Sequence, residues 1–181
     1  MATAKADFGG IDVLVNATGG DDVPKLLQDT ALADIAPMLH RCLLPQLLAC
    51  RAALPIMREQ GSGAIINIAS DAAKLPTPGE TVIGAALAGI VMFTRALALE
   101  AKRNGIRANV RTPSLTGGTD HYRRVMDDAF AGKMFAKAAA MASLGVVGKE
   151  ELAGLVVFVA SPAAAQITGQ AISMTGGISA L

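Results

Sequence analysis

Residues 82–93 carry no charged side chain, and this run restricts the fold more than any other feature of the chain. It forms the first half of a segment with a helical pattern from about residue 81 to 103. Asn104-Gly105 follows, a pair suited to a left-handed helix cap. A helix that is apolar on every face is buried on every face. We therefore expect this helix to be surrounded by the rest of the protein.

Short apolar runs alternate with helical patterns along the chain. We expect strands at 11–16, 64–68, 106–110 and 171–174, and helices at 38–60, 81–103 and 149–160, with a polar helical region over 120–142. Within the predicted helix 38–60, Pro45 predicts a kink and Pro55 predicts a frayed end. Strands separated by helices predict an α/β fold, with a parallel sheet and helices on both faces.

The charge, the apolar runs and the cysteines of the chain indicate which binding partners and which cellular compartment to expect. The chain has 181 residues and a net charge of +1, which gives no indication of binding to nucleic acid or to an anionic membrane. No uninterrupted apolar run reaches the roughly 18 residues of a membrane span. Cys42 and Cys50 would lie about 12 Å apart on a helix, too far for a disulfide. We expect reduced thiols and a cytoplasmic protein.

Five segments in order resemble the short-chain dehydrogenase/reductase family. They are 8–19 and 63–70, which resemble its fourth and fifth strands, 94–100 and 105–110, which resemble the end of its active-site helix and its sixth strand, and 167–177, which is similar to its C-terminal strand. The resemblance implies one truncated domain over 1–181, with a Rossmann-like sheet that lacks the first strands and helices of the dinucleotide-binding half. The first remaining strand, 11–15, would then lie at the sheet edge.

The catalytic positions of that family are mostly replaced. Ser70 matches its catalytic serine, whereas Ile83, Leu87 and Cys42 stand where it has tyrosine, lysine and asparagine. Isoleucine and leucine cannot exchange a proton, and a lone serine has no base to activate it. The single tyrosine, Tyr122, is far away in sequence. We expect no catalytic residue and no metal ligand in this chain.

The glycine-rich turn that cradles the dinucleotide in this family has no counterpart. The remaining glycine pairs read as turns and caps, and Pro113-Ser114 replaces the Pro-Gly that borders the nicotinamide. We expect no cofactor in this chain and NAD(P) in a partner subunit.

These features predict a chain that is not an enzyme by itself. The prediction is a non-catalytic pseudoenzyme subunit of a hetero-oligomeric, NAD(P)-dependent alcohol or hydroxyacyl-CoA dehydrogenase, which structurally supports an active full-length subunit. The resemblance extends to inactive subunits of such dehydrogenases, as in benzylsuccinate breakdown. Contact would be made through 38–60 and 81–103, or through the C-terminal helix and strand, 149–177.

Three alternatives stay open. The chain could be a decayed homo-oligomeric remnant, or a binding protein for a small ligand near Ser70 and the loop from Thr116. It could also be an enzyme with new chemistry that uses Ser70, Asp71, Lys74 or Cys42, although Asp71 and Lys74 read more simply as a solvated pair. Arg111 stands where the family has an apolar residue, and we expect it to reach solvent or a partner chain.

Overall fold

A four-stranded parallel sheet forms the centre of the computed structural model, which describes residues 1–180. Its order is β1 (Val13–Asn16), β2 (Gly63–Ile68), β3 (Ile106–Pro113) and β6 (Ala171–Met174). The α/β class and the four expected strands are confirmed. β1 lies at the edge, as expected, and its Val13 and Val15 side chains are each 43% exposed.

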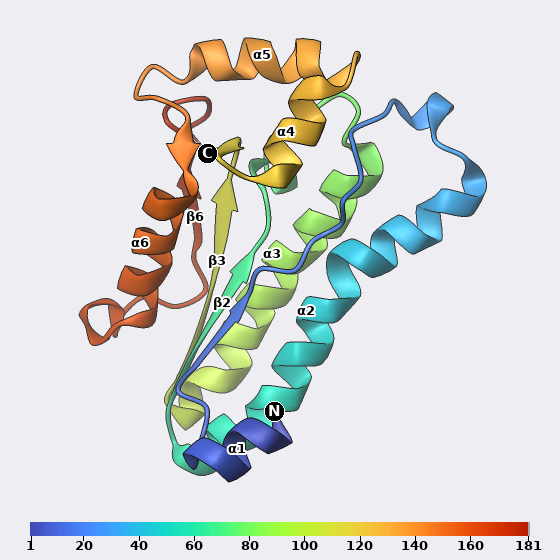
Figure 1. Ribbon diagram of the computed structural model, residues 1–181. Coiled ribbons are helices and arrows are strands. Elements are labelled where there is room, and N and C mark those ends of the chain that lie inside the picture. The colour runs from blue at the N-terminus through green and yellow to red at the C-terminus, as the bar shows by residue number, and fades with distance from the viewer. Residues whose placement is uncertain (181) are drawn as a thin grey trace.

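Helices cover both faces of this sheet. Figure 1 shows α2 (Leu32–Gln60) and α3 (Thr81–Ala101) on one face and α6 (Lys149–Ala160) on the other. Short 3-10 turns occur at Leu27–Asp29, Asp71–Ala73, Lys102–Asn104 and Pro162–Ala164. The helix α1 (Ala2–Phe8) lies near the amino ends of the strands.

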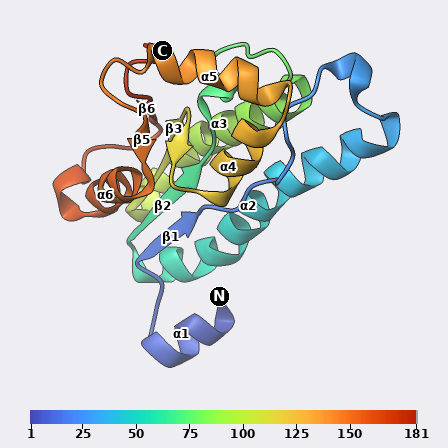
Figure 2. The same cartoon turned by 45° about the horizontal axis from the view of Figure 1, so that its top comes forward.

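Two further helices close the opposite end of the sheet. α4 (Asp120–Asp127) and α5 (Ala131–Met141) lie over the carboxyl ends of the strands in both Figure 1 and Figure 2. A small ladder of β4 (Thr116–Gly117) and β5 (Val147–Gly148) ties the segment that carries them to the start of α6. The expected helical region 120–142 is therefore two helices, separated near Asp128.

Helix α2 begins earlier than predicted and ends at Gln60, as predicted. It begins six residues before residue 38 and continues unbroken through Pro45 and Pro55 to Gln60, so the expected frayed end is wrong. Gly61 then stops the helix in a left-handed conformation. Gly105 stops the turn after α3 in the same way, with φ of 69°, and a Cβ there would meet the carbonyl oxygen of Gly61 at 2.2 Å. Only glycine fits this approach.

Helix α3 is a core helix with one uncovered face. Its buried side chains, among them Ile90, Val91 and Leu97, pack against the sheet and α2, but Met92 and Leu99 are 62% and 67% exposed. The expectation of burial on every face is therefore wrong for a single chain. By length and hydropathy alone the segment Thr81–Asn104 is apolar enough to cross a membrane. Its packing against the sheet assigns it to the core of this fold instead.

Polar side chains tie the sheet to both covering helices. Asn16 donates to the Asn67 side-chain oxygen at 2.8 Å, and Asn67 donates to the Thr94 hydroxyl at 2.8 Å. Gln46 on α2 donates to the carbonyl oxygens of Thr18 and Ile68, at 3.1 and 2.8 Å. These bonds fix the carboxyl ends of β1 and β2 relative to α2 and α3.

Arg111 lies inside the protein, so the expectation that it reaches solvent is wrong. The residue is fully buried in β3, between Ile68 of β2 and Ile172 of β6 in the strand register. None of its three guanidinium nitrogens has a hydrogen-bond partner among the residues that the structure describes. Burial lowers its pKa to about 10. A buried cation without a partner opposes folding.

We predict that Arg111→Met stabilises the protein. Methionine keeps much of the length of the side chain and removes the desolvated charge, so the free energy of unfolding should rise by about 1–4 kcal/mol. Urea unfolding monitored by circular dichroism measures the change. The exposed Arg103→Met is the matched control and should stay within about 0.5 kcal/mol of the parent. A loss of stability in Arg111→Met would show that the guanidinium is favourably accommodated.

Candidate active site

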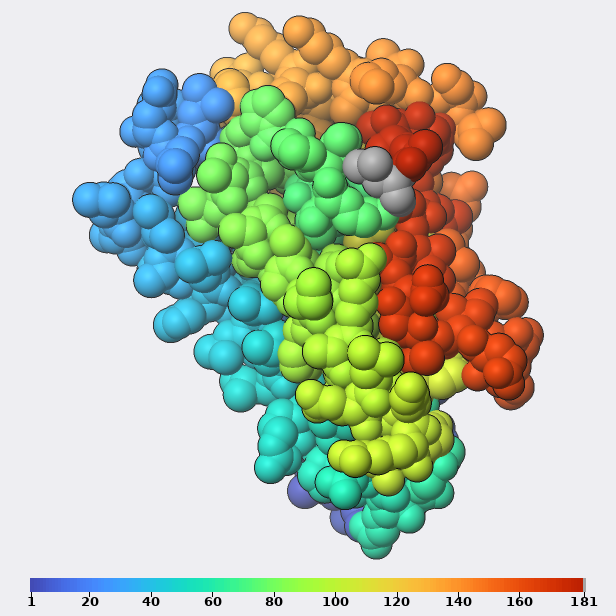
Figure 3. Space-filling model, turned by 180° about the vertical axis from the view of Figure 1, so that it is seen from behind, coloured from blue at the N-terminus to red at the C-terminus, as the bar shows by residue number. Residues whose placement is uncertain are grey.

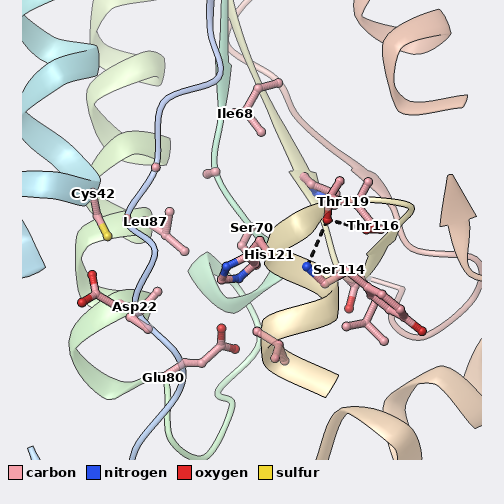
Figure 4. Close-up of a pocket in the computed structure, with 18 of the residues that line it drawn as sticks. Asp22, Cys42, Ile68, Ser70, Glu80, Leu87, Ser114, Thr116, Thr119 and His121 are labelled. Atoms are coloured by element: carbon pink, nitrogen blue, oxygen red, sulfur yellow. Dashed lines mark hydrogen bonds between the residues drawn. The ribbon is translucent and has the colours of Figure 1, made fainter. Parts of the chain in front are cut away.

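A cavity of about 230 Å³ opens at the carboxyl ends of β1, β2 and β3. Its walls are the backbone 17–20 after β1, residues 68–70 at the end of β2, residues 113–116 after β3, and side chains from α2, α3, α4 and α5. The loops beyond the carboxyl ends of parallel strands are where α/β proteins bind ligands. Figure 4 shows this cavity with the side chains that line it.

The four residues singled out in the sequence come together here. Cys42, Ser70, Ile83 and Leu87 all line the cavity. Ile83 and Leu87 follow Glu80 by three and seven residues on α3, so the three side chains share one helix face. That Cys42, Ile83 and Leu87 stand at the asparagine, tyrosine and lysine positions of the family stays a prediction.

Ser70 is held with its hydroxyl proton available. It caps the 3-10 turn that follows β2, and its Oγ accepts a hydrogen bond from the Ala72 amide at 3.3 Å. A serine hydroxyl that accepts in this way still has one proton to donate. Ser70 is therefore suited to hold the oxygen of a ligand in the cavity.

The other candidates for new chemistry are less available. Burial raises the pKa of the Cys42 thiol, which keeps it in the weakly nucleophilic protonated form. Asp71 is buried and accepts from Ser179 at 2.5 Å, while Lys74 donates to Ser173. The two side chains do pair, with 4.0 Å between the Lys74 Nζ and an Asp71 carboxylate oxygen, but the expectation that the pair is solvated is wrong. Both side chains are largely buried and tie the turn after β2 to the C-terminal segment. Asp71 lines only a neighbouring cavity.

The cavity is also lined by three side chains that were not predicted as site residues from the sequence: Glu80, His121 and Tyr122. The last two come from α4, where Thr119 accepts from the Tyr122 amide at 3.1 Å and donates to the Thr116 carbonyl at 3.0 Å (Figure 4). Tyr122 thus lines the same cavity as Ser70 although the two are distant in sequence. The one local signal was the Thr119-Asp120 pair, which is typical of a helix start.

Ion pairs hold the polypeptide that follows β1 around the cavity. Arg41 of α2 pairs with Asp22 at 2.6 Å, and Arg124 of α4 pairs with Asp21 at 2.5 Å.

Burial is the main cause that lowers the pKa of His121, and the nearby Arg124 lowers it further. His121 is therefore neutral near pH 7.

Glu80 is the acid whose protonation changes near neutral pH. Burial is the main cause that raises its pKa to about 7, the Asp71 carboxylate raises it further, and a hydrogen bond with Thr77 opposes both. In Figure 4 its carboxylate points from the start of α3 toward the part of the cavity where Ser70 and His121 lie. A carboxyl group in this state can act as acid or as base at pH 7.

The residues described here do not fit a complete nicotinamide dinucleotide. Gly19 leaves open space beside the backbone after β1, which suits the approach of a flat ring. No glycine-rich turn joins a strand directly to a helix within residues 1–180, and α2 begins only at Leu32. At the start of α6, the Gly148 amide is already bound by the Glu151 carboxylate at 2.7 Å, which obstructs a phosphate there. Within the same residues no group of three metal-binding side chains occurs.

We predict that Glu80 makes stability fall as pH rises. Its pKa is about 7 in the folded protein against 4.5 for an ordinary glutamate, so the folded state binds more protons between these values. The contribution is fully present below pH 4.5 and is lost as pH rises through 7, with a ceiling of about 3 kcal/mol. Urea unfolding at pH 5 and pH 8 measures it. Glu80→Gln should remove this loss, whereas Glu100→Gln at an exposed position of α3 should keep it.

The sequence and the fold match a large group of known proteins. A sequence profile described as enoyl-(acyl carrier protein) reductase matches residues 1–179. A 1,6-dihydroxycyclohexa-2,4-diene-1-carboxylate dehydrogenase of Pseudomonas putida is 32% identical over 98% of this chain and 68% of its own length. The 3-oxoacyl-(acyl-carrier-protein) reductase of Escherichia coli is 34% identical over 96% of this chain and 69% of its own length.

Solved structures agree with these relatives. A gluconate 5-dehydrogenase from Burkholderia cenocepacia, in complex with NADP and tartrate, superposes with a TM-score of 0.87 at 27% identity, and covers 98% of this chain and 68% of its own. A 7α-hydroxysteroid dehydrogenase in complex with NADH gives a TM-score of 0.87 at 25% identity over 97% of this chain and 67% of its own. The Rossmann-like class is thereby confirmed.

These relatives correct one expectation. Proteins about one-third identical over nearly the whole chain are dehydrogenases and reductases, so the prediction that the chain is not an enzyme is wrong. The chain belongs to the short-chain dehydrogenase/reductase family of oxidoreductases.

Proposed function

We propose that this chain is a subunit of an NAD(P)-dependent short-chain dehydrogenase that interconverts a secondary alcohol, such as a hydroxyacyl thioester, and the corresponding ketone. It pairs with a full-length subunit of the same family, which holds the dinucleotide. The cytoplasm is the compartment we propose, supported by two buried free cysteines.

An uncovered apolar surface on α2 and α3 supports this proposal most directly. Leu44 and Leu48 of α2 are 41% and 58% exposed, and Met92 and Leu99 of α3 are exposed still further. Leu44 and Leu48 lie one turn apart, as Met92 and Leu99 lie two turns apart, so each pair shares one helix face. We call these four residues the two-helix surface. Figure 3 shows α2 and α3 side by side on the outside of the molecule.

The relatives support the reaction class and the cofactor. The gluconate dehydrogenase binds NADP and the hydroxysteroid dehydrogenase binds NADH. Because the described residues of this chain do not hold a pyrophosphate, we assign the dinucleotide to the partner subunit. We propose that this chain contributes the two-helix surface and the cavity around Ser70 to that assembly.

We predict that the two-helix surface forms the subunit contact. The chain is coexpressed with each full-length short-chain dehydrogenase of the same genome, and any complex is purified and assayed with NAD and NADP on secondary alcohols. A stable, active complex is expected. A double variant, Leu48→Glu with Met92→Glu, should abolish co-purification, because two charges would be buried in an apolar contact.

Val157→Glu is the matched control. Val157 is 67% exposed on α6, at the alternative contact surface, and this variant should leave the complex intact. Loss of the complex in Val157→Glu with retention in the double variant would move the contact to the C-terminal helix and strand. Absence of any complex, with the chain as a homo-oligomer, would overturn the proposed pairing.

A further inference from the structure

Two cavities meet at the carboxyl end of β2. The first, of about 230 Å³, is the candidate active site, and the second, of about 290 Å³, lies between the turn after β2 and α5. Both are lined by Ser70, Glu80 and Ser114. The lining that the two cavities share therefore carries two hydroxyl groups, of Ser70 and Ser114, and one carboxyl group, of Glu80.

The shared wall combines a fixed donor with a base. The Ser70 Oγ already accepts from the Ala72 amide, so its proton is directed to another acceptor. Glu80 starts the face of α3 that continues with Ile83 and Leu87, neither of which offers it a charge or a hydrogen bond. Near pH 7 Glu80 is partly carboxylate and partly acid, so it can both take and return a proton.

The other polar groups near this wall are already bound or are poorer bases. One oxygen of the Asp22 carboxylate is paired with Arg41 and one oxygen of Asp71 accepts from Ser179, and each residue lines one of the two cavities but not the other. The Cys42 thiol is held protonated by burial. His121 is neutral but lies on α4, across the cavity mouth from the second cavity, which it does not line. Glu80 is the titratable group common to both cavities.

We propose that this wall catalyses the reversible enolisation of a ketone, an activity that needs no nicotinamide and goes beyond the proposed hydride transfer. The Glu80 carboxylate removes a proton from the carbon beside the carbonyl. The C–H electron pair becomes a carbon–carbon double bond as the carbonyl π pair moves to oxygen, where the Ser70 hydroxyl donates a hydrogen bond. The protonated Glu80 then returns a proton to the same carbon, so nothing is oxidised or reduced.

The second cavity indicates the class of ketone. Its wall is mainly apolar, and its side chains include Leu75, Pro76, Met134, Met141 and Ile178. An unbranched apolar chain fits this lining, with the carbonyl oxygen at Ser70. The proposed substrate is a ketone that carries an apolar tail, rather than a small polar ketone or a sugar.

Deuterium exchange tests this activity without any cofactor. The purified chain is incubated with 2-octanone in D₂O at pH 7 and 8, and deuterium in the ketone is followed by NMR. We expect the chain to accelerate exchange above buffer, and Glu80→Gln to lower the accelerated rate by about 10²-fold or more, as loss of a general base does. Ser70→Ala should lower it by about 10²-fold.

Glu100→Gln, the same substitution at an exposed position of α3, should keep the parent rate. Hydroxyacetone, a small polar ketone, should exchange more slowly than 2-octanone relative to buffer. Exchange no faster than in buffer with the parent chain, or unchanged exchange in folded Glu80→Gln, would overturn the proposal. Because no partner and no dinucleotide are present, either result is independent of whether the dehydrogenase complex forms.

Discussion

The amide of Asn67 joins the sheet to its covering helix, and the arrangement of the cavity depends on this link. It accepts from Asn16 of the edge strand and donates to Thr94 of α3, at 2.8 Å in both cases. All three side chains are buried, so a lost partner would leave a polar group desolvated inside the core. The link fixes the register of β1 against β2 and the height of α3 against the sheet.

The position of α3 determines what the cavity contains. With Thr94 held at the sheet, the amino end of the same helix lies over the carboxyl end of β2, where Glu80, Ile83 and Leu87 face the cavity beside Ser70. Gln46 performs the equivalent task for α2, because its amide donates to the carbonyl oxygens of Thr18 and Ile68, two residues of the cavity walls. Buried amides, rather than the apolar core alone, thus position the groups with chemistry.

Local sequence predicted the strands and missed several of the site residues, for physical reasons. The run 64–68 is apolar except for Asn67 and is almost wholly buried, so its pattern identifies the strand directly. Ser70, Cys42, Ile83 and Leu87 were placed by family spacing, and all four line one cavity. His121 and Tyr122 were missed because they reach the cavity through the fold of a separate helix, which no local pattern encodes.

Arg111 shows the opposite failure. The charge of Arg111 favoured an exposed side chain, whereas its place in the central strand β3 buries the side chain. Pro55 of α2 gave a similar error, because the helix packs against α3 and the sheet and continues through this proline to Gln60. In both cases tertiary context decided against a local preference.

The apolar residues at 83 and 87 change the chemistry of the site rather than only removing it. A cation at 87, two turns from Glu80 on the same face, would stabilise the Glu80 carboxylate and lower its pKa. Leucine there leaves the carboxyl group to burial and to the repulsion of Asp71, the two causes that raise its pKa to about 7. Leu87, which we predict to stand at the family's lysine position, thereby leaves a glutamate able to exchange protons at neutral pH.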